Sequence, residues 1–322
     1  MLIKTPKFWL EKNYISYALW PLSLVYLGCT KVVEFLQQPR KAGKPVICIG
    51  NLTMGGSGKT PVALAIGRIL QELNIDFAYL SRGYGSASKF GFVTDKSWPR
   101  EVGDEPLILA ERAPTFVSKE RVSGARTIIN TSSAQAIVMD DGMQNNSLHK
   151  DFTILVIDGK IKFGNEFLFP AGPLRQTVVS GLAKANLVVV VGEVSEELVE
   201  LLNFTDKKVV GAKLKAQNLA NFSGKKLIAF CGLAYPQKFF SFLENQGLKA
   251  SEVHEFPDHY LYKNSDLDKL LQQAKKQDAT LITTKKDWVK FPKNFQKKIP
   301  YLDVELEFDD KKLVSHALKC LF

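Results

Sequence analysis

The chain has 322 residues, of which 45% are hydrophobic and 24% charged, the composition of an ordinary globular protein with one large or two medium-sized domains. Its four cysteines, Cys29, Cys48, Cys231 and Cys320, form no CxxC pair, so no zinc or iron–sulfur site is expected and a reducing compartment is the simplest inference. The formal net charge is +10, and residues 1–44, with seven basic and two acidic side chains, contribute +5 of it. Such a segment attracts anionic lipid, nucleic acid or a phosphorylated substrate, and charge alone does not choose among them.

An uncharged stretch lies close to the N-terminus. Residues 13–30 contain no charged side chain, but the run is shorter than the roughly 20 residues of a spanning helix and includes Pro21. A signal peptide fits poorly because no small-residue cleavage site follows. A membrane-surface anchor, a buried helix of a soluble core and a true span all remain open. The anchor is favoured because aromatic side chains that suit the headgroup boundary are frequent here, namely Phe8, Trp9, Tyr14, Tyr17, Trp20 and Tyr26.

A glycine-rich loop follows the first apolar strand of the chain. Residues 46–49 form this strand, the loop ends in Gly58-Lys59-Thr60, and an apolar helical pattern continues over residues 62–70. This is the strand–loop–helix context of a Walker A motif, although the pattern G-x-x-x-x-G-K-[ST] asks for glycine where the chain has Thr53. The alternative is an ordinary βα turn, which the flanking context disfavours. The loop predicts a nucleoside triphosphate site.

The residues of this loop have distinct expected roles. Backbone N–H groups of glycines can turn inward around phosphates, where the N-terminus of the next helix adds positive charge. Lys59 would reach the β- and γ-phosphates, and the Thr60 hydroxyl would ligate Mg²⁺. We therefore expect ATP and Mg²⁺ as cofactors, with the nucleotide bound by Gly55, Gly56, Ser57, Gly58, Lys59 and Thr60.

Strands and helices alternate along the rest of the chain, which predicts a parallel α/β sheet covered on both faces. A polar stretch over residues 205–225 separates this unit from a second, smaller α/β unit. The expected organisation is an N-terminal membrane-associated helix (1–35), a P-loop kinase domain (36–215) and a C-terminal domain (216–322), with a cleft between the two domains. The expected strands cover residues 77–81, 115–117, 136–140, 152–157, 187–191, 227–231, 252–256 and 280–284, and the expected helices cover residues 103–113, 236–245 and 265–276.

Two adjacent carboxylates end one of the apolar strands. The sequence AIVMDDG over residues 136–142 places Asp140 and Asp141 at the strand end, the arrangement of a Walker B motif that holds Mg²⁺. The alternative is a simple Asp-Gly turn. Because a P-loop lies upstream, the metal-binding interpretation is favoured, with Thr60, Asp140 and Asp141 as ligands.

Three further motifs are less specific on their own. Asp104, in the sequence GDEP, is more typical of a helix start than of a catalytic base. His259, in FPDHY, is a lone histidine beside an aspartate and suggests a structural role. The sequence TKKD over residues 284–287 resembles a guanine-reading motif, but it lies far from Lys59, and the chain has DDGM where a GTPase has DxxG.

Taken together, the motifs GNLTMGGSGKTP, SRGYG, VGDEP, VMDDGMQN, FPAGPLR, FPDHY and T-x-K-D resemble those of the tetraacyldisaccharide 4'-kinase family, over nearly the whole chain. The resemblance implies a monotopic enzyme on the cytoplasmic face of the bacterial inner membrane. It would transfer the γ-phosphate of ATP to the 4'-hydroxyl of a tetraacylated glucosamine disaccharide 1-phosphate, making lipid IVA in lipid A biosynthesis. No nucleic acid and no obligate protein partner are implied.

The resemblance also assigns residues. It makes Asp104 the catalytic base, partnered by His259, with Lys59 as the third catalytic group. Substrate-binding roles are expected for residues in SRGYG, DDGMQ and PLR, namely Arg82, Tyr84, Gln144 and Arg175. Arg82 or Arg175 would clamp a phosphate of the substrate or of the nucleotide, and the sequence does not say which. A dyad divided between two domains would couple transfer to domain closure.

The chain departs from the family pattern at a few positions. The family usually has DDGFQH and PLRE, whereas this chain has Met143, Asn145 and Gln176. A neutral amide at 176 shifts the expected metal binding toward Asp140 and Asp141. Two other functions remain open: a P-loop kinase of a soluble metabolite, and a membrane-associated NTPase switch.

Overall fold

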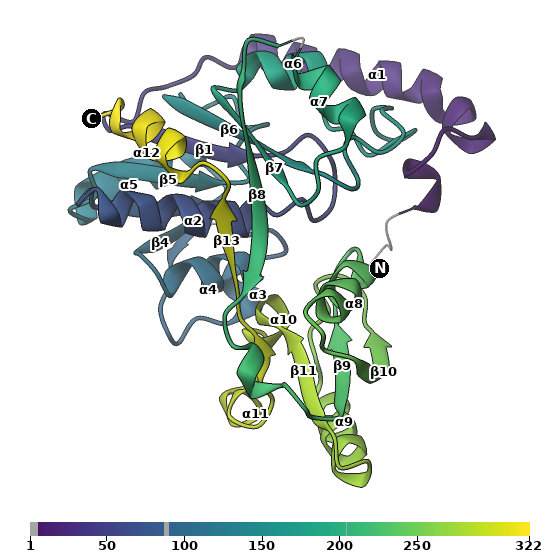
Figure 1. The fold of residues 1–322 in the computed structure, drawn as a ribbon. Helices are drawn as coiled ribbons and strands as arrows, with labels where there is room; N and C mark the ends of the chain where they lie inside the picture. The colour runs from purple at the N-terminus through teal and green to yellow at the C-terminus, as the bar shows by residue number, and fades with distance from the viewer. Residues whose placement is uncertain (1–5, 87–89, 204) are drawn as a thin grey trace.

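The computed structural model describes residues 6–86, 90–203 and 205–322, so the first five residues of the expected N-terminal segment lie outside the described part. Two β-sheets of unequal size organise the chain, with the larger in the upper half of Figure 1 and the smaller below it. Both carry helices on their faces, as the alternation of strand and helix patterns predicted. The predicted α/β class with a second, smaller unit and an N-terminal apolar helix is confirmed.

The larger sheet has nine strands in the order β13-β8-β7-β6-β1-β5-β2-β4-β3. The seven inner strands run parallel, and the two edge strands, β13 and β3, are antiparallel to their neighbours. Continuous apolar runs form most inner strands because both faces of the sheet are buried. The strands are β1 (Val46–Gly50), β2 (Phe77–Ser81), β3 (Phe90–Phe92), β4 (Thr115–Ser118), β5 (Ala136–Asp140), β6 (Phe152–Asp158), β7 (Leu187–Val191), β8 (Lys208–Ala216) and β13 (Val304–Phe308).

Alternate side chains of β1 divide the core into two layers. Ile47 and Ile49 face the layer formed with α2 (Lys59–Glu72), α4 (Asp104–Ala110) and α12 (Lys311–Lys319). Val46 and Cys48 face the opposite layer, formed with α5 (Arg121–Thr131), α6 (Val178–Lys184) and α7 (Glu196–Asn203). A short helix, α3 (Pro99–Val102), precedes α4. The carboxyl ends of β1 and β5 therefore lie together at one edge, where the loops that follow them meet.

The smaller sheet is fully parallel, in the order β10-β9-β11-β12. Its strands and helices are β9 (Leu227–Cys231), α8 (Pro236–Asn245), β10 (Ala250–Glu255), α9 (Asn264–Lys276), β11 (Thr280–Thr284), α10 (Lys285–Trp288), α11 (Lys293–Gln296) and β12 (Tyr301–Leu302), and a 3₁₀ turn, Leu219–Asn221, precedes them. Its predicted strands and helices are present within a few residues of the expected bounds.

The chain returns to the larger sheet after the smaller one. β13 pairs with β8, and α12 packs against α2, so the expected C-terminal unit of residues 216–322 is not continuous in the structure. The polar stretch 205–225 also contains β8, which the sequence analysis missed. Lys208, Lys213 and Lys215 give this strand a polar composition because it lies next to the sheet edge and is only partly buried.

The N-terminal segment forms a short 3₁₀ turn (Lys7–Trp9) and then α1 (Tyr14–Leu36), which lies along the top of the molecule in Figure 1. The helix turns small polar residues inward: Ser16 and Ser23 are its only fully buried members among the described residues. The Ser23 hydroxyl donates to the carbonyl of Leu168 at 2.7 Å and accepts from the amide of Ala171 at 3.2 Å. By length and composition, α1 alone among the described helices could cross a membrane.

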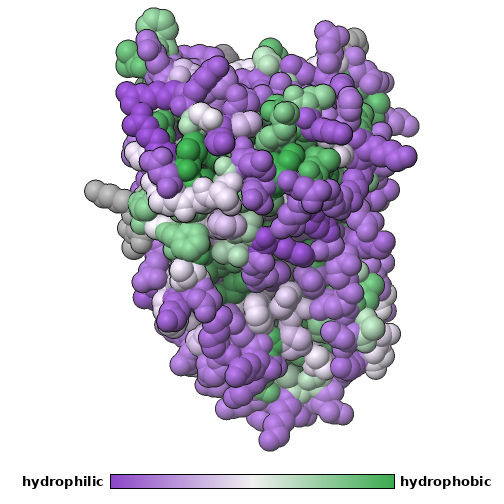
Figure 2. Space-filling model, turned by 90° about the vertical axis from the view of Figure 1, so that its left-hand side faces the viewer, coloured by the Kyte–Doolittle hydropathy of each residue, from purple (hydrophilic) through white to green (hydrophobic). Residues whose placement is uncertain are grey.

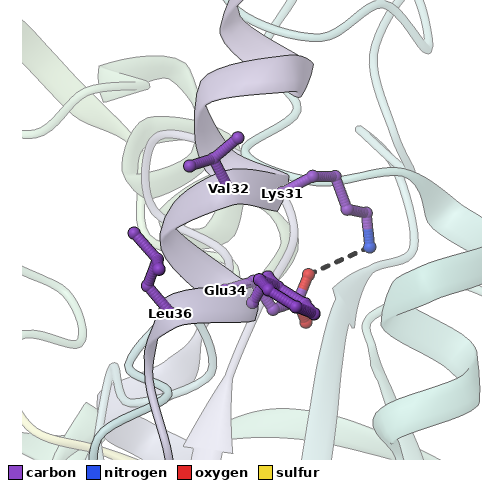
Figure 3. A pocket seen from close by; sticks show the side chains of 5 residues that line it. Lys31, Val32, Glu34 and Leu36 are labelled. Carbon is purple, nitrogen blue, oxygen red and sulfur yellow. Dashed lines mark hydrogen bonds and ion pairs between the residues drawn. The ribbon is translucent and has the colours of Figure 1, made fainter.

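The opposite side of α1 exposes apolar side chains to the surroundings. Phe35 is 88% exposed, and Val25 and Val32, seven residues apart and so on one face of the helix, are each more than half exposed. Figure 3 shows Val32 and Leu36 projecting on one side of α1, while the Lys31–Glu34 ion pair lies on the other. By contrast, Figure 2 shows a mostly hydrophilic lower half of the molecule on the face it presents. A soluble core helix would bury these side chains, so the structure disfavours that alternative.

Candidate active site

The predicted P-loop connects β1 to α2. Gly55 and Gly58 have φ values of +109° and +87°, which residues with a side chain rarely adopt. Gly58 is also the N-cap of α2, so the positive end of this helix faces the loop. The departure from the Walker pattern at position 53 has a structural reason. Thr53 forms an antiparallel bridge with Leu174, and this extended backbone conformation does not require glycine.

The predicted Walker A and Walker B residues meet at the carboxyl ends of β1 and β5. The Lys59 ammonium donates to Oδ1 of Asn51 at 3.1 Å and lies 3.7 Å from Oδ1 of Asp141. The Thr60 hydroxyl donates to Oδ2 of Asp140 at 3.4 Å. The lysine, the hydroxyl and the two carboxylates thus form one cluster, as expected from the sequence.

The two carboxylates have opposite electrostatic character. Burial, reinforced by the neighbouring charge of Asp141, raises the pKa of Asp140 to about 7. Burial also acts to raise the pKa of Asp141, but Lys59 and Arg175 outweigh it and hold this pKa below its ordinary value. The charge of Lys59 acts to lower the pKa of Asp140 but does not offset its burial, and no ion pair joins Asp140 to a cation among the described residues.

The same cluster fits a magnesium ion. Oδ1 of Asp140 and the Ser57 hydroxyl are buried and have no hydrogen-bond partner among the described residues. Carboxylate and hydroxyl oxygens are the ligands that Mg²⁺ prefers. A divalent cation would offset the burial of the Asp140 carboxylate more fully than Lys59 does.

A polar network links the P-loop to the segment after β6. One guanidinium nitrogen of Arg175 donates to both carboxylate oxygens of Asp141, at 3.2 and 3.3 Å, and to Gln144 at 3.2 Å. Gln144 in turn donates to the carbonyl of Asn51 at 2.8 Å. Arg175 and Gln144 are predicted from the sequence to bind substrate; in the structure their polar groups contact Asp141 and the P-loop.

Two family departures lie near this network. The Asn145 side chain accepts from the Ser147 hydroxyl and the Leu148 amide, and so caps a local turn. Gln176 lines a groove of about 260 Å³ beneath α1, and its Nε2 is buried with no hydrogen-bond partner among the described residues. The stronger reliance on Asp140 and Asp141 for metal binding stays a prediction.

Asp104 and His259 form a direct pair between the two sheets. Asp104 is the first residue of α4 and only 4% exposed, while His259 follows β10 with φ +56°, in the left-handed region. Nδ1 of His259 lies 2.9 and 3.0 Å from the two carboxylate oxygens of Asp104. The Tyr84 ring stands 5.3 Å from the imidazole, whereas Arg82 is exposed on the same loop.

The pair is strongly polarised. Burial alone would raise the pKa of Asp104, but the hydrogen bond from His259 and the charge of Lys286 lower it to about 2. Burial would lower the pKa of His259, but the hydrogen bond to Asp104 raises it above its ordinary value. The favoured state is therefore an ionised Asp104 carboxylate that accepts a hydrogen bond from a protonated ring nitrogen of His259.

Asp104, Glu105 and His259 also place three ligand atoms within 4.8 Å of one another, as a metal site would. The Lys286 ammonium already supplies positive charge there, 3.0 Å from Glu105 and 3.8 Å from Asp104. Glu105 is close enough to Asp140 and Asp141 to influence the pKa of each. The acids of the GDEP motif thus lie between the dyad and the P-loop cluster.

The smaller unit also contacts the P-loop directly. Lys238, in the first turn of α8, donates to the carbonyl of Gly56 at 3.3 Å and forms an ion pair with Asp158. A Cβ atom at Gly55 would approach the Tyr235 ring to 3.1 Å. Neither residue was predicted from the sequence, since neither belongs to a recognisable motif.

Asp287 does not have the free carboxylate that guanine recognition requires. It is fully buried, and it accepts from the Gly232 amide, the Tyr262 hydroxyl and the Thr284 hydroxyl at 2.7 to 3.0 Å. Lys290 forms an ion pair with it at 2.8 Å. Its role is structural, and the structure gives no support to the GTPase-like interpretation of residues 284–287.

Comparison with known proteins agrees with these observations. The family model described as tetraacyldisaccharide-1-P 4'-kinase matches residues 15–321. A tetraacyldisaccharide 4'-kinase from Rhodospirillum rubrum is 38% identical over 314 residues, covering 96% of this chain and 95% of that protein. One from Gluconobacter oxydans is 37% identical over 332 residues, covering 100% and 99%. A solved structure of LpxK from Aquifex aeolicus in complex with ATP superposes with a TM-score of 0.80 and 25% identity, covering 96% of this chain and 99% of that one. The chain therefore belongs to the tetraacyldisaccharide-1-P 4'-kinase family.

Proposed function

We propose that this protein transfers the γ-phosphoryl group of ATP to the 4'-hydroxyl of tetraacyldisaccharide 1-phosphate, a step of lipid A biosynthesis. Family membership supports the reaction, and the names of the relatives support the acceptor. The ATP in the similar solved structure supports the donor. The observation that carries the proposal is the hydrogen-bonded Asp104–His259 pair, which joins the smaller unit to the P-loop sheet.

The P-loop residues hold and orient the donor. Backbone N–H groups of residues 55–60 and the N-terminus of α2 surround the phosphates, and Lys59 neutralises charge between the β- and γ-phosphates. Thr60, Asp140 and Asp141 would hold Mg²⁺, which neutralises phosphate charge when bound. Arg175 and Gln144 keep Asp141 and the loop in place through the hydrogen bonds described above.

Asp104 serves as the base. The 4'-oxygen of the sugar forms a bond to the γ-phosphorus, the bond from that phosphorus to the bridging oxygen breaks, and ADP leaves. The hydroxyl proton passes to Asp104, whose orientation is fixed by His259. Because the two residues come from different sheets, the site is complete only when the units are together, which also excludes water from the γ-phosphate.

The apolar face of α1 anchors the enzyme at the bilayer that contains its substrate. This face is exposed and apolar, and basic residues flank the helix, as in helices that lie in the interface of anionic membranes. The proposed location is the cytoplasmic face of the bacterial inner membrane. Arg82 and Tyr84 are exposed on the loop after β2, where the Tyr84 ring lies against His259, and they are the proposed contacts to the disaccharide headgroup.

The test is phosphate transfer from γ-labelled ATP to purified tetraacyldisaccharide 1-phosphate in mixed micelles. The proposal expects a labelled glycolipid whose new phosphate lies on the 4'-oxygen, identified by phosphorus–proton NMR correlation. Lys59→Ala serves as the inactive control. Label transferred only to a water-soluble acceptor would favour a metabolite kinase. Slow hydrolysis without any acceptor product would favour an NTPase switch.

A further inference from the structure

Lys286 occupies a position between the dyad and the P-loop sheet that the reaction described above does not use. It lies in α10, directly after β11, where α10 packs against α4. Its ammonium group is 3.0 Å from Glu105, 3.6 Å from Asp258 and 3.8 Å from Asp104. It also lies 3.4 Å from Nε2 of His259. One cation therefore contacts three carboxylates and the His259 imidazole.

These contacts define which nitrogen of His259 carries the proton. A carboxylate only accepts hydrogen bonds, so Nδ1, facing Asp104, must donate. An ammonium group only donates, so Nε2, facing Lys286, must accept and carry no proton. Asp258 would favour a proton on Nε2, but its oxygen is 3.8 Å away, beyond hydrogen-bond distance, and it contacts the same ammonium group.

We propose that Lys286 is a positioning residue of the Asp104–His259 pair: its ammonium group faces Nε2 of His259, directs the Nδ1 proton to Asp104, and ties both residues to Glu105. The inference rests on the proposed function and deepens it. Lys286 touches neither donor nor acceptor in this scheme; it acts by setting the proton content and orientation of the dyad. It also supplies, from the smaller unit, the cation that a metal would otherwise provide at this cluster.

The charges around His259 explain why this cation matters. Asp104 and Glu105 face the ring from α4, Asp258 from its own loop and Lys286 from α10, with the Tyr84 ring against one side. Lys290 is a further cation that acts on Asp104. Without Lys286, three carboxylates would face the imidazole, and they would hold a proton on both of its nitrogens. Lys286 lowers the pKa of both His259 and Asp104.

The first experiment compares pH profiles of phosphoryl transfer. In Lys286→Met, the acidic limb of kcat/KM should move upward by about one pH unit or more, as expected for loss of a charge within 4 Å. Activity at neutral pH should fall about tenfold or more, with a smaller change in the KM for ATP. Lys286→Arg keeps the charge and should restore most of the wild-type profile.

Lys285→Met provides the matched control. Lys285 is the preceding residue of α10 and joins the same two units through an ion pair with Glu111 at 2.6 Å, away from the dyad. Its loss should weaken the interface without moving the acidic limb. If both methionine variants lower activity equally and leave the pH profile unchanged, Lys286 is only an interface residue and the proposal fails.

A second experiment reads the tautomer directly and does not require activity. The chain has four histidines, so selective ¹⁵N-histidine labelling with His259→Gln for assignment isolates one ring. Wild-type His259 should be the Nδ1–H tautomer at about pH 8, and its pKa should rise in Lys286→Met. An Nε2–H tautomer in the wild type would overturn the proposal even if the variant failed to fold. Wild-type protein that has the Nδ1–H tautomer at His259 but transfers no phosphate would instead refute the proposed function.

Discussion

Lys59 has a role expected from the sequence motif and, in the structure, contacts that the motif does not predict. It is expected to neutralise charge on the nucleotide, and in the structure it also contacts Asn51 and Asp141, which belong to the network around the P-loop. Lys59→Ala should lower kcat by on the order of 10²-fold or more, the usual effect of removing one preorganised electrostatic group. The measurement is lipid phosphorylation under saturating ATP. Near-normal turnover would mean that the loop is not a working Walker A motif.

The Asp104–His259 pair should make stability depend on pH from both sides. The pKa of Asp104 is about 2, below its ordinary value of 3.8. Its contribution to the free energy of unfolding is therefore present above pH 3.8 and is lost as the pH falls toward 2. The pKa of His259 is above 6.5. Its contribution to the free energy of unfolding is therefore fully present below pH 6.5 and is lost as the pH rises through the raised pKa. The Tm difference between wild type and His259→Gln should therefore be largest between pH 3.8 and 6.5. A difference that stays constant from pH 3 to pH 9 would contradict the ion pair.

Asp287 should be needed for stability and not for nucleotide choice. Breaking a buried, ion-paired carboxylate typically costs about 3 kcal/mol or more, so Asp287→Asn should lower the free energy of unfolding by that amount. Asp268→Asn, on the exposed side of the neighbouring α9, is the matched control and should have little effect. Denaturant unfolding measures the difference, and the ratio of ATP to GTP use should stay unchanged. A shift in that ratio with unchanged stability would restore the guanine-reading interpretation.

Among the secondary-structure elements, α1 has two dissimilar sides. Its inner side packs on residues 167–175, which also pair with the P-loop: Met54 donates to Pro173, and Arg175 to Leu52, both at 2.8 Å. Complete removal of α1 would therefore disturb support of the nucleotide site as well as any membrane contact. Substitutions on the exposed side separate these two effects.

Val25→Glu combined with Val32→Glu should reduce sedimentation with anionic liposomes by about tenfold or more, because two charges would enter the apolar side of an interfacial helix. ATP affinity should be unchanged, since both residues point away from the P-loop segment. The control, Gln272→Glu with Lys276→Gln on exposed positions of α9, makes the same change in net charge and should bind liposomes normally. Equal binding by all three proteins would exclude α1 as the anchor.

The strands, the Walker cluster and the dyad differ in how far sequence could predict them. The apolar runs of β1, β5 and β7 were predictable because burial on both faces demands continuous hydrophobicity. The Asp104–His259 pair was predicted only through the family resemblance, since its members are 155 positions apart. β8 was missed because its many lysines hide the pattern of an edge-proximal strand.

In the molecule as a whole, individual polar contacts join the two units, and no periodic pattern in the sequence predicts them. The contact of Lys238 with Gly56 and that of Lys286 with Glu105 each join residues more than 100 positions apart in the sequence. Both contacts depend on how the smaller unit is placed relative to the larger. The return of the chain through β13 and α12 depends on the same placement. Sequence could predict each unit; it could not predict these contacts between them.

Asp104 and His259, one from each unit, are proposed to act together in phosphoryl transfer. A double-mutant cycle tests it: Asp104→Ala, His259→Ala and the double variant, with kcat measured for lipid phosphorylation and ATP affinity measured separately. We expect large losses in kcat for each single variant, little further loss in the double variant, and nearly unchanged ATP affinity. Fully additive losses, or loss of ATP binding in either single variant, would contradict it.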